Sequence, residues 1–204
     1  MHSYLGVTIS FFTSKILDKI SDNLVDKGYI ILDIKDPIIQ SLAKHALELD
    51  NFTLALIGRD DLKQEQLDIR SDETVWLDED NDVDGLYLKA MQSLQEGMNE
   101  RLFMGLKYHE AHYSHYKPGT FYQKHLDAFR GKSSRKLTTV LYLNESWKAD
   151  YGGDLLIYDE ADNLLERVVP NFGRLVIFLS DSFPHEVLIS NRDRYSIAGW
   201  FRID

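Results

Sequence analysis

The chain has 204 residues, a formal net charge of -10 at pH 7, 44% hydrophobic residues and no cysteine. This composition is typical of a soluble globular protein; it excludes disulfides, thiolate metal sites and cysteine nucleophiles, and its negative charge disfavours nucleic acid as a partner. No apolar stretch approaches the roughly 20 residues of a membrane-spanning helix, and the first residues lack a secretory-signal pattern, so we expect no membrane partner and a cytoplasmic location.

The first hundred residues are predicted to be mainly helical. Hydrophobic residues at helical spacing predict a helix over 12–26, with Thr13 or Ser14 as its cap. The apolar run "YIILDI" then predicts a buried strand. A second helix is predicted from Pro37, capped by Asp36, to about residue 49. Helical spacing returns after residue 85 in "GLYLKAMQSLQEGMNERL".

From about residue 107 the chain changes to short aromatic and β-branched runs separated by Gly, Asn and Asp. These runs predict strands over 108–116, 121–125, 136–144, 154–158, 174–180, 184–189 and 194–202. Their short, even spacing favours a barrel or sandwich with helices packed outside. We therefore expect a single domain over residues 1–204, mainly β with flanking helices.

Two motifs look like metal sites, but a structural interpretation is favoured for each. In "YHEAHYSHY" the spacing differs from that of zinc proteases, and strand alternation sends His109 and His115 to one face and His112 to the other. The segment Asp80–Asp84 copies the opening of a calcium loop, but Met91 stands where a closing glutamate is needed. We expect half-buried strand histidines and a solvated acidic loop, with a second cation at the acidic loop as the alternative.

A stronger candidate site combines a metal triad with a cation. His125 and Asp127 share one side of a predicted strand, and His185 supplies a third ligand from a later one. Two imidazoles and one carboxylate leave open positions on an octahedral ion, as in non-haem Fe(II) oxygenases. A dicarboxylate cosubstrate also needs a cation, and Arg194 follows His185 by nine residues, in a strand we expect to lie antiparallel beside that of His185. Ser196 shares the strand face of Arg194 and offers a hydroxyl donor.

Five segments carry a family resemblance: "HYKPGTFYQKHLDAF", "TTVLYLNESW", "YGGDLLIYD", "PNFGRLVIFLSDSFPHEV" and "RYSIAGWF". They resemble the Fe(II)- and 2-oxoglutarate-dependent prolyl 4-hydroxylases, above all the Egl-nine (hypoxia-inducible-factor prolyl hydroxylase) branch and its bacterial relatives. The resemblance covers about residues 70–202. It implies a double-stranded β-helix (jelly-roll) catalytic core over 101–204, with residues 1–100 as a helical support and substrate-loop region packed on one sheet.

The resemblance also implies roles for individual residues. It implies an iron site held by His125, Asp127 and His185. It implies that Arg194 binds the distal carboxylate of 2-oxoglutarate, in a pocket with further side chains: Tyr142, Ser196, Tyr116, Tyr122 and Trp200. Animal members carry a threonine where this chain has Ala198, so we expect Ser196 to supply that donor.

Substrate residues are implied in two places. The segment "IRSDETVWL" resembles the strand that leads into the substrate loop, which places Arg70, Asp72 and Trp76 near the entrance. Arg135 matches a substrate-contacting arginine of the Egl-nine branch.

The implied reaction oxidises 2-oxoglutarate with O2 to succinate and CO2 and hydroxylates a prolyl residue in a protein, with L-ascorbate as reductant. A loop proline in a translation factor is the family-based expectation for the substrate. Two alternatives remain: the same chemistry on a small molecule or nucleobase, and a non-catalytic cupin-like binding module. The negative charge disfavours a nucleobase, and a binding module would not need Arg194 and Tyr142 beside a complete triad.

Overall fold

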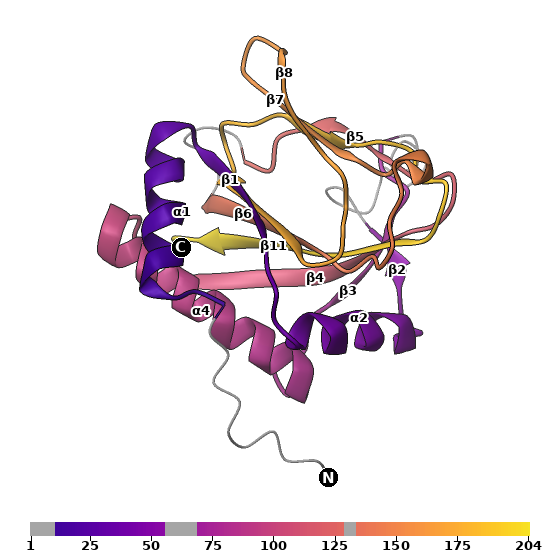
Figure 1. Ribbon diagram of the computed structural model, residues 1–204, viewed down its shortest axis with the longest axis horizontal. Coiled ribbons are helices and arrows are strands. Elements are labelled where there is room, and N and C mark those ends of the chain that lie inside the picture. Colours follow the sequence, from indigo (N-terminus) through magenta and orange to yellow (C-terminus); the bar gives the residue numbers. More distant parts are fainter. Residues whose placement is uncertain (1–10, 56–68, 129–133) are drawn as a thin grey trace.

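A computed structural model describes residues 11–55, 69–128 and 134–204 and shows two antiparallel sheets with helices on one side (Figure 1). The seven-stranded sheet has the order β1-β9-β6-β11-β4-β3-β2. Its strands are β1 (Tyr29–Asp33), β2 (Thr53–Leu54), β3 (Glu73–Trp76), β4 (Tyr108–Tyr116), β6 (Arg135–Tyr142), β9 (Arg174–Leu179) and β11 (Arg194–Arg202). The four-stranded sheet has the order β5-β10-β7-β8. Its strands are β5 (Tyr122–His125), β7 (Leu155–Tyr158), β8 (Leu164–Val168) and β10 (His185–Val187), and a short 3-10 turn, η2 (Ala149–Tyr151), precedes β7.

The helices are α1 (Ser14–Asp26), α2 (Ile38–Glu48) and α4 (Asp82–Leu102). The Thr13 hydroxyl caps α1 as predicted, and the Asp36 carboxylate accepts the Ile38 backbone N–H at 3.0 Å at the start of α2. Within the described residues, no helix is both long enough and apolar enough to cross a membrane.

The third helix begins earlier than the sequence pattern predicts. The Asn81 side chain accepts the backbone N–H groups of Val83 and Asp84 at 2.9 and 3.2 Å, so α4 starts inside the acidic segment rather than after residue 85. Asp84 is buried and accepts the Tyr113 hydroxyl at 2.6 Å. The expected solvated loop is therefore partly wrong: half of it is a helix N-terminus, where acidic side chains stabilise the exposed N–H groups.

Two separate cores explain the layered arrangement. One lies between the helices and the outer face of the seven-stranded sheet and includes Ile20, Leu42, Leu94 and Phe201. The other, which includes Phe178, lies between the two sheets. Figure 1 shows α1, α2 and α4 on the same side of the large sheet, which confirms the predicted jelly roll with flanking helices.

Strand β4 alternates as predicted. His109 packs against Tyr87 of α4 and Phe201, on the helix-facing side, whereas His112 faces the other sheet. Burial in this apolar layer lowers the pKa of His109 to about 3. The three histidines of this strand do not form a metal site together.

One strand-pairing prediction is wrong. The strand of Arg194 does not lie beside that of His185, because β11 pairs with β4 and β6 whereas β10 pairs with β5 and β7. The chain crosses from one sheet to the other between β10 and β11, so the two side chains approach from opposite layers. Strand β8 was also missed: it is an edge strand whose consecutive leucines and charged residues hide a period of two.

Candidate active site

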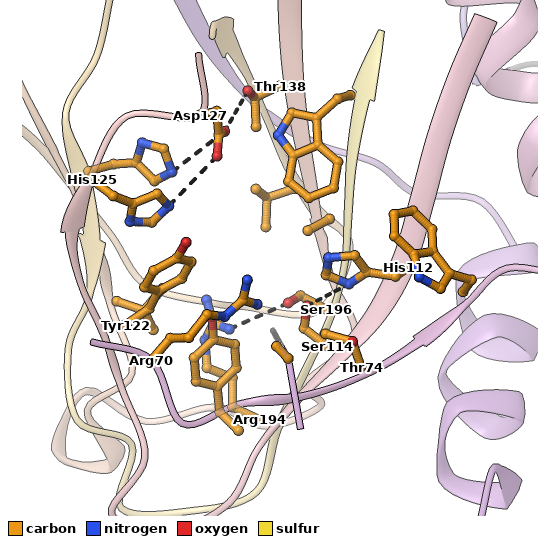
Figure 2. A pocket seen from close by; sticks show the side chains of 18 of the residues that line it. Arg70, Thr74, His112, Ser114, Tyr122, His125, Asp127, Thr138, Arg194 and Ser196 are labelled. Carbon is orange, nitrogen blue, oxygen red and sulfur yellow. Dashed lines mark hydrogen bonds and ion pairs between the residues drawn. The ribbon is translucent and has the colours of Figure 1, made fainter. Parts of the chain in front are cut away.

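A cavity of about 550 Å³ opens between the two sheets, and side chains from both of them line it. Figure 2 shows His125 and Asp127 on one side of this cavity and Arg194 and Ser196 on another. All thirteen candidate site residues from the sequence except Tyr142 and Asp72 line it. The cavity therefore unites the predicted metal site and the predicted cosubstrate site.

His125, Asp127 and His185 form a three-ligand cluster. One possible ligand atom from each residue lies within 4.8 Å of the others. The Nε2 atoms of His125 and His185 each lie 3.7 Å from a different carboxylate oxygen of Asp127. The two histidines are direct cross-strand partners in β5 and β10, which brings their rings to 4.3 Å between centroids. Such a set can hold a single divalent ion and leave positions open.

Backbone carbonyls fix the tautomer of both imidazoles. His125 Nδ1 lies 2.8 Å from the Gln123 carbonyl oxygen, and His185 Nδ1 lies 3.0 Å from the Phe183 carbonyl oxygen. A carbonyl oxygen only accepts hydrogen bonds, so Nδ1 must carry the proton and donate it in each ring. Each Nε2 then keeps its lone pair for a metal, which is the orientation that metal-binding histidines need.

Asp127 reaches the cluster from outside the strand. Strand β5 ends at His125, so the expected i and i+2 alternation on one strand is wrong for this pair; Asp127 lies in the following bend. Its Oδ2 accepts the Thr138 hydroxyl at 2.7 Å, and Thr138 is in turn 2.9 Å from the Ser180 hydroxyl. Burial raises the pKa of this carboxyl, but the neighbouring imidazoles and the Thr138 hydroxyl outweigh it and hold the pKa below its usual range. Asp127 therefore stays anionic and can serve as a metal ligand.

Arg194 is a buried cation without an acidic partner. Its side chain is 1% exposed, its Nε has no hydrogen-bond partner among the described residues, and no described carboxylate pairs with it. Its guanidinium lies over the rings of Tyr116 and Tyr142, at 4.6 and 5.0 Å from their centroids. Only a long contact of 3.4 Å joins Nη1 to the Ser196 hydroxyl. A buried, unpaired guanidinium is costly, so this end of the cavity fits the carboxylate of a ligand.

Four hydroxyl-bearing side chains form a row across the large sheet, and two of them, Ser196 and Tyr142, contact this cation. Thr74, Ser114, Ser196 and Tyr142 are successive cross-strand partners on β3, β4, β11 and β6. Tyr142 is fully buried and its hydroxyl has no partner with hydrogen-bond geometry, although it is not a lining residue of the cavity. Burial raises the pKa of Tyr142 to about 12 despite the nearby arginine charge, so it stays a proton donor.

A glycine makes room for the arginine. Gly153 has a φ of +68°, and a Cβ added there would lie 2.9 Å from Arg194 Cδ. A side chain at this position would displace the guanidinium as well as strain the backbone. Gly153 of "YGGDL" therefore leaves room for Arg194 through its lack of a side chain.

Aromatic groups line the mouth and floor of the cavity. Trp76 is 57% exposed at the rim, His112 lies 5.3 Å from it, and Trp200 lies 5.4 Å beyond His112, measured between ring centroids. Arg135 covers Trp200 at 3.8 Å and donates to Glu110. Burial lowers the pKa of His112 to about 4, so its imidazole is neutral near pH 7.

Arg70 and Asp72 have a different arrangement from the expected pair of substrate ligands. Arg70 donates from Nε and Nη2 to the two carboxylate oxygens of Asp72, at 2.8 and 2.7 Å. Asp72 is 1% exposed and does not line the cavity, whereas Arg70 does. In this structure Asp72 therefore pairs with Arg70 and is too buried to contact a substrate.

Three groups near the site were not found from the sequence. Thr138 supports Asp127, while His112 and Ser114 face the cavity and approach each other to 3.1 Å between Nδ1 and Oγ. Strand alternation offered the signal for Ser114, since it follows His112 by two residues on the same face. Strand alternation gave no such signal for Thr138, because its contact with Asp127 depends on how the two sheets pack.

Comparisons with known proteins agree with this geometry. The sequence model of the 2OG-Fe(II) oxygenase superfamily matches residues 111–202. Human prolyl hydroxylase EGLN3 is 40% identical over 85 residues, which cover 41% of this chain and 35% of that protein. The chain thus spans about a third of the length of the curated relatives first matched.

Solved structures give longer matches. A prolyl-4-hydroxylase from Pseudomonas putida is 34% identical, with a TM-score of 0.83 over 92% of this chain and 99% of that one. A Trichoplax adhaerens prolyl hydroxylase in complex with a hypoxia-inducible-factor peptide shares the fold, with a TM-score of 0.82 at 23% identity over 93% of this chain and 90% of that one. The chain therefore belongs to the prolyl 4-hydroxylase family of the 2OG-Fe(II) oxygenase superfamily.

Proposed function

We propose that the protein is an Fe(II)- and 2-oxoglutarate-dependent dioxygenase that hydroxylates a prolyl residue in a protein substrate. One observation carries the proposal: a His-Asp-His cluster and a buried arginine without an acidic partner lie in the same cavity. Together these two features match the two ends of a metal-chelating dicarboxylate. A non-catalytic cupin-like module would need only the metal ligands.

The protein's own residues have separable tasks in this proposal. His125, Asp127 and His185 hold the ion through two neutral Nε2 atoms and one carboxylate. Bound Fe(II) supplies the oxidation of 2-oxoglutarate by O2 to succinate and CO2, with the second oxygen atom inserted into a substrate C–H bond. The chain orients both partners and excludes water from the site.

The cosubstrate end is proposed to lie at Arg194. Its guanidinium would bind the distal carboxylate through charge-assisted hydrogen bonds, and Ser196 and Tyr142 would add hydroxyl donors beside it. Tyr116 lies against the same guanidinium, and Tyr122 and Trp200 line the cavity towards the metal. A ligand carboxylate would satisfy the buried donors that have no partner in the protein.

The substrate is proposed to enter past Trp76 and Arg135. The exposed indole at the rim and the guanidinium over Trp200 present flat apolar and cationic surfaces to a peptide. The named relatives act on prolyl residues, and one of them was solved with a bound peptide, which favours a protein substrate. A translation factor with a proline in a loop is the first substrate to test. The alternative is the same chemistry on a small molecule. L-ascorbate is proposed as the reductant, a single domain as the functional unit, and the cytoplasm as its location.

Two measurements test the proposal. Purified protein with Fe(II), 2-oxoglutarate and ascorbate is expected to release succinate, and His125→Ala is expected to abolish this release. The surface variant Lys44→Ala, in an exposed ion pair on α2, serves as the control. Mass spectrometry of the host proteome with and without the active enzyme is expected to show a +16 Da proline. A change confined to a metabolite would favour the small-molecule alternative, and tight zinc binding without consumption of 2-oxoglutarate would refute the oxygenase.

A further inference from the structure

Three side chains form a continuous stack that ends at a metal ligand. The imidazole of His125 lies parallel to the ring of Tyr122, with centroids 3.6 Å apart and an interplanar angle of 13°. On its other side the guanidinium carbon of Arg70 lies 4.4 Å from the centroid of Tyr122. Figure 2 shows Arg70, Tyr122 and His125 in this order along one wall of the cavity.

Both ends of the stack are fixed. At the far end, the bidentate ion pair with buried Asp72 fixes the plane of the Arg70 guanidinium. At the near end, the Gln123 carbonyl oxygen holds Nδ1 of His125 at 2.8 Å. The tyrosine ring between them therefore has little freedom to tilt, and it transmits this constraint to the imidazole.

The backbone around Arg70 is tied directly to the strand of the metal ligand. Arg70 and Tyr122 form an isolated antiparallel bridge. The Gln123 N–H donates to the Ile69 carbonyl at 2.7 Å, and the Ser71 N–H donates to the Phe121 carbonyl at 3.1 Å. Residues 69–71 thus extend the small sheet beyond β5, and β3 then continues the same segment into the large sheet.

His125 needs this support more than His185 does. Strand β5 has four residues, and its pairing with β10 shifts register between His125 and Tyr122. The His125 side chain is 18% exposed, whereas the His185 side chain is 7% exposed and packs on Phe178 in the core. Without the stack, the more exposed imidazole would be oriented by the Gln123 hydrogen bond and by its contacts with His185 and Asp127.

We propose that Arg70 and Tyr122 are positioning residues that hold His125 in its metal-binding orientation, rather than groups that bind substrate or cosubstrate through their polar atoms. The proposal rests on the metal site of the proposed function, but not on its reaction. The guanidinium is already engaged by Asp72 and by the ring face, so its role in the site passes through Tyr122. Residues that orient metal ligands commonly affect metal affinity by about 10- to 100-fold.

The experiment measures metal binding without turnover. Metal-free protein is titrated with Co(II), and both the affinity and the visible ligand-field spectrum are recorded. Tyr122→Phe keeps the stacked ring and is expected to bind Co(II) within about twofold of wild type, with the same spectrum. Tyr122→Leu removes the stack and is expected to bind about 10- to 100-fold more weakly, with shifted bands.

A second variant tests the outer layer. Arg70→Met combined with Asp72→Leu removes both charges together, because a lone buried carboxylate would endanger folding. This double variant is expected to weaken Co(II) binding by about 5- to 30-fold. Arg101→Met, which breaks an ion pair with Asp18 between α1 and α4, is the matched control and should leave both readouts unchanged. Thermal unfolding of each metal-free variant confirms that the comparison is made on folded protein.

The outcomes are distinct. Wild-type affinity and spectrum in Tyr122→Leu, or in the double variant, would overturn the proposal. Equal losses in Tyr122→Phe and Tyr122→Leu would also overturn it, since the hydroxyl and not the stacked ring would then matter. If the wild type binds Co(II) and the variants lose affinity, but no succinate forms with Fe(II), the proposed function fails while this inference stands.

Discussion

Replacing Arg194 with methionine is expected to separate stability from cosubstrate binding. In the ligand-free protein the guanidinium is buried, stacked between two tyrosines, and has no carboxylate partner among the described residues. Methionine has a similar length and no charge to desolvate. Replacing buried charges by apolar groups of similar volume is often neutral or stabilising by about 1–4 kcal/mol. Arg194→Met should therefore unfold at the same or a higher urea concentration than wild type when 2-oxoglutarate is absent.

Binding should change in the opposite direction and by much more. A guanidinium that binds a carboxylate in a bidentate manner makes two charge-assisted hydrogen bonds, and each contributes about 1.5–3 kcal/mol. Their sum of about 3–6 kcal/mol corresponds to a loss of roughly two to four orders of magnitude in affinity. Wild-type protein with Mn(II) should gain thermal stability on addition of 2-oxoglutarate, because a ligand that binds only the folded state stabilises it. The variant should show this gain only at concentrations of 2-oxoglutarate higher by about the same factor.

The assay pairs urea unfolding without ligand with thermal shifts over a 2-oxoglutarate series. Arg101→Met is the control, because its ion pair with Asp18 lies on the helices and away from the cavity. It should lose at most about 1 kcal/mol and keep the wild-type 2-oxoglutarate response. A variant Arg194→Met that loses about 3–5 kcal/mol of stability and still responds to 2-oxoglutarate like wild type would refute the reasoning, since the arginine would then be a structural group.

Three further outcomes follow from single contacts. His109→Gln should make the stability of the fold less sensitive to acid. Burial lowers the pKa of His109 to about 3, so the folded protein loses stability as the pH falls below the pKa of a histidine in the unfolded chain. In urea unfolding, wild type should lose about 2 kcal/mol more than the variant between about pH 6 and pH 4.5. Equal losses would contradict this assignment. Thr138→Val removes the hydroxyl that holds the carboxylate ligand and should weaken Co(II) binding by about tenfold in titrations, whereas unchanged affinity would show that the ligand needs no such donor. Gly105→Ala, at φ +67° with open space around it, should cost about 1 kcal/mol and leave the 2-oxoglutarate thermal shift unchanged, whereas Gly153→Ala should cost more and also weaken that shift, because its Cβ would contact Arg194.

The candidate metal ligands and the arginine could be chosen from the sequence because the chemistry of these residue types is specific. A His-x-Asp pair, a distant histidine and a later arginine together match the ligands of a non-haem iron site and a carboxylate-binding cation, and His125, His185 and Arg194 occur in predicted β runs. Strand alternation does not place these residues as predicted. Asp127 reaches the cluster from a bend, and Arg194 faces His185 from another sheet instead of a neighbouring strand.

The interior supports of the site could not be read from periodicity. Thr138 contacts Asp127 only because β6 passes under the bend after β5, and no local pattern encodes that packing. Arg70 was expected near a substrate, but its bidentate pairing with Asp72 depends on a segment that crosses between sheets. Local sequence patterns predict strands and the face on which a side chain lies, whereas contacts between the two sheets can be identified only once the fold is known.

The division of the site between the two sheets determines what it can select. The histidine ligands belong to β5 and β10 of the small sheet, whereas Arg194, Ser196 and Tyr142 belong to β11 and β6 of the large one. The span between metal and guanidinium is therefore set by the packing of the inner core, where Phe178 of the large sheet lies 4.9 Å from the ring of His185. Close-packed interiors change little in thickness, so a ligand must match this span to satisfy both ends at once. If a dicarboxylate binds as proposed, selection for its length would thus depend on sheet packing as much as on the residues that touch it.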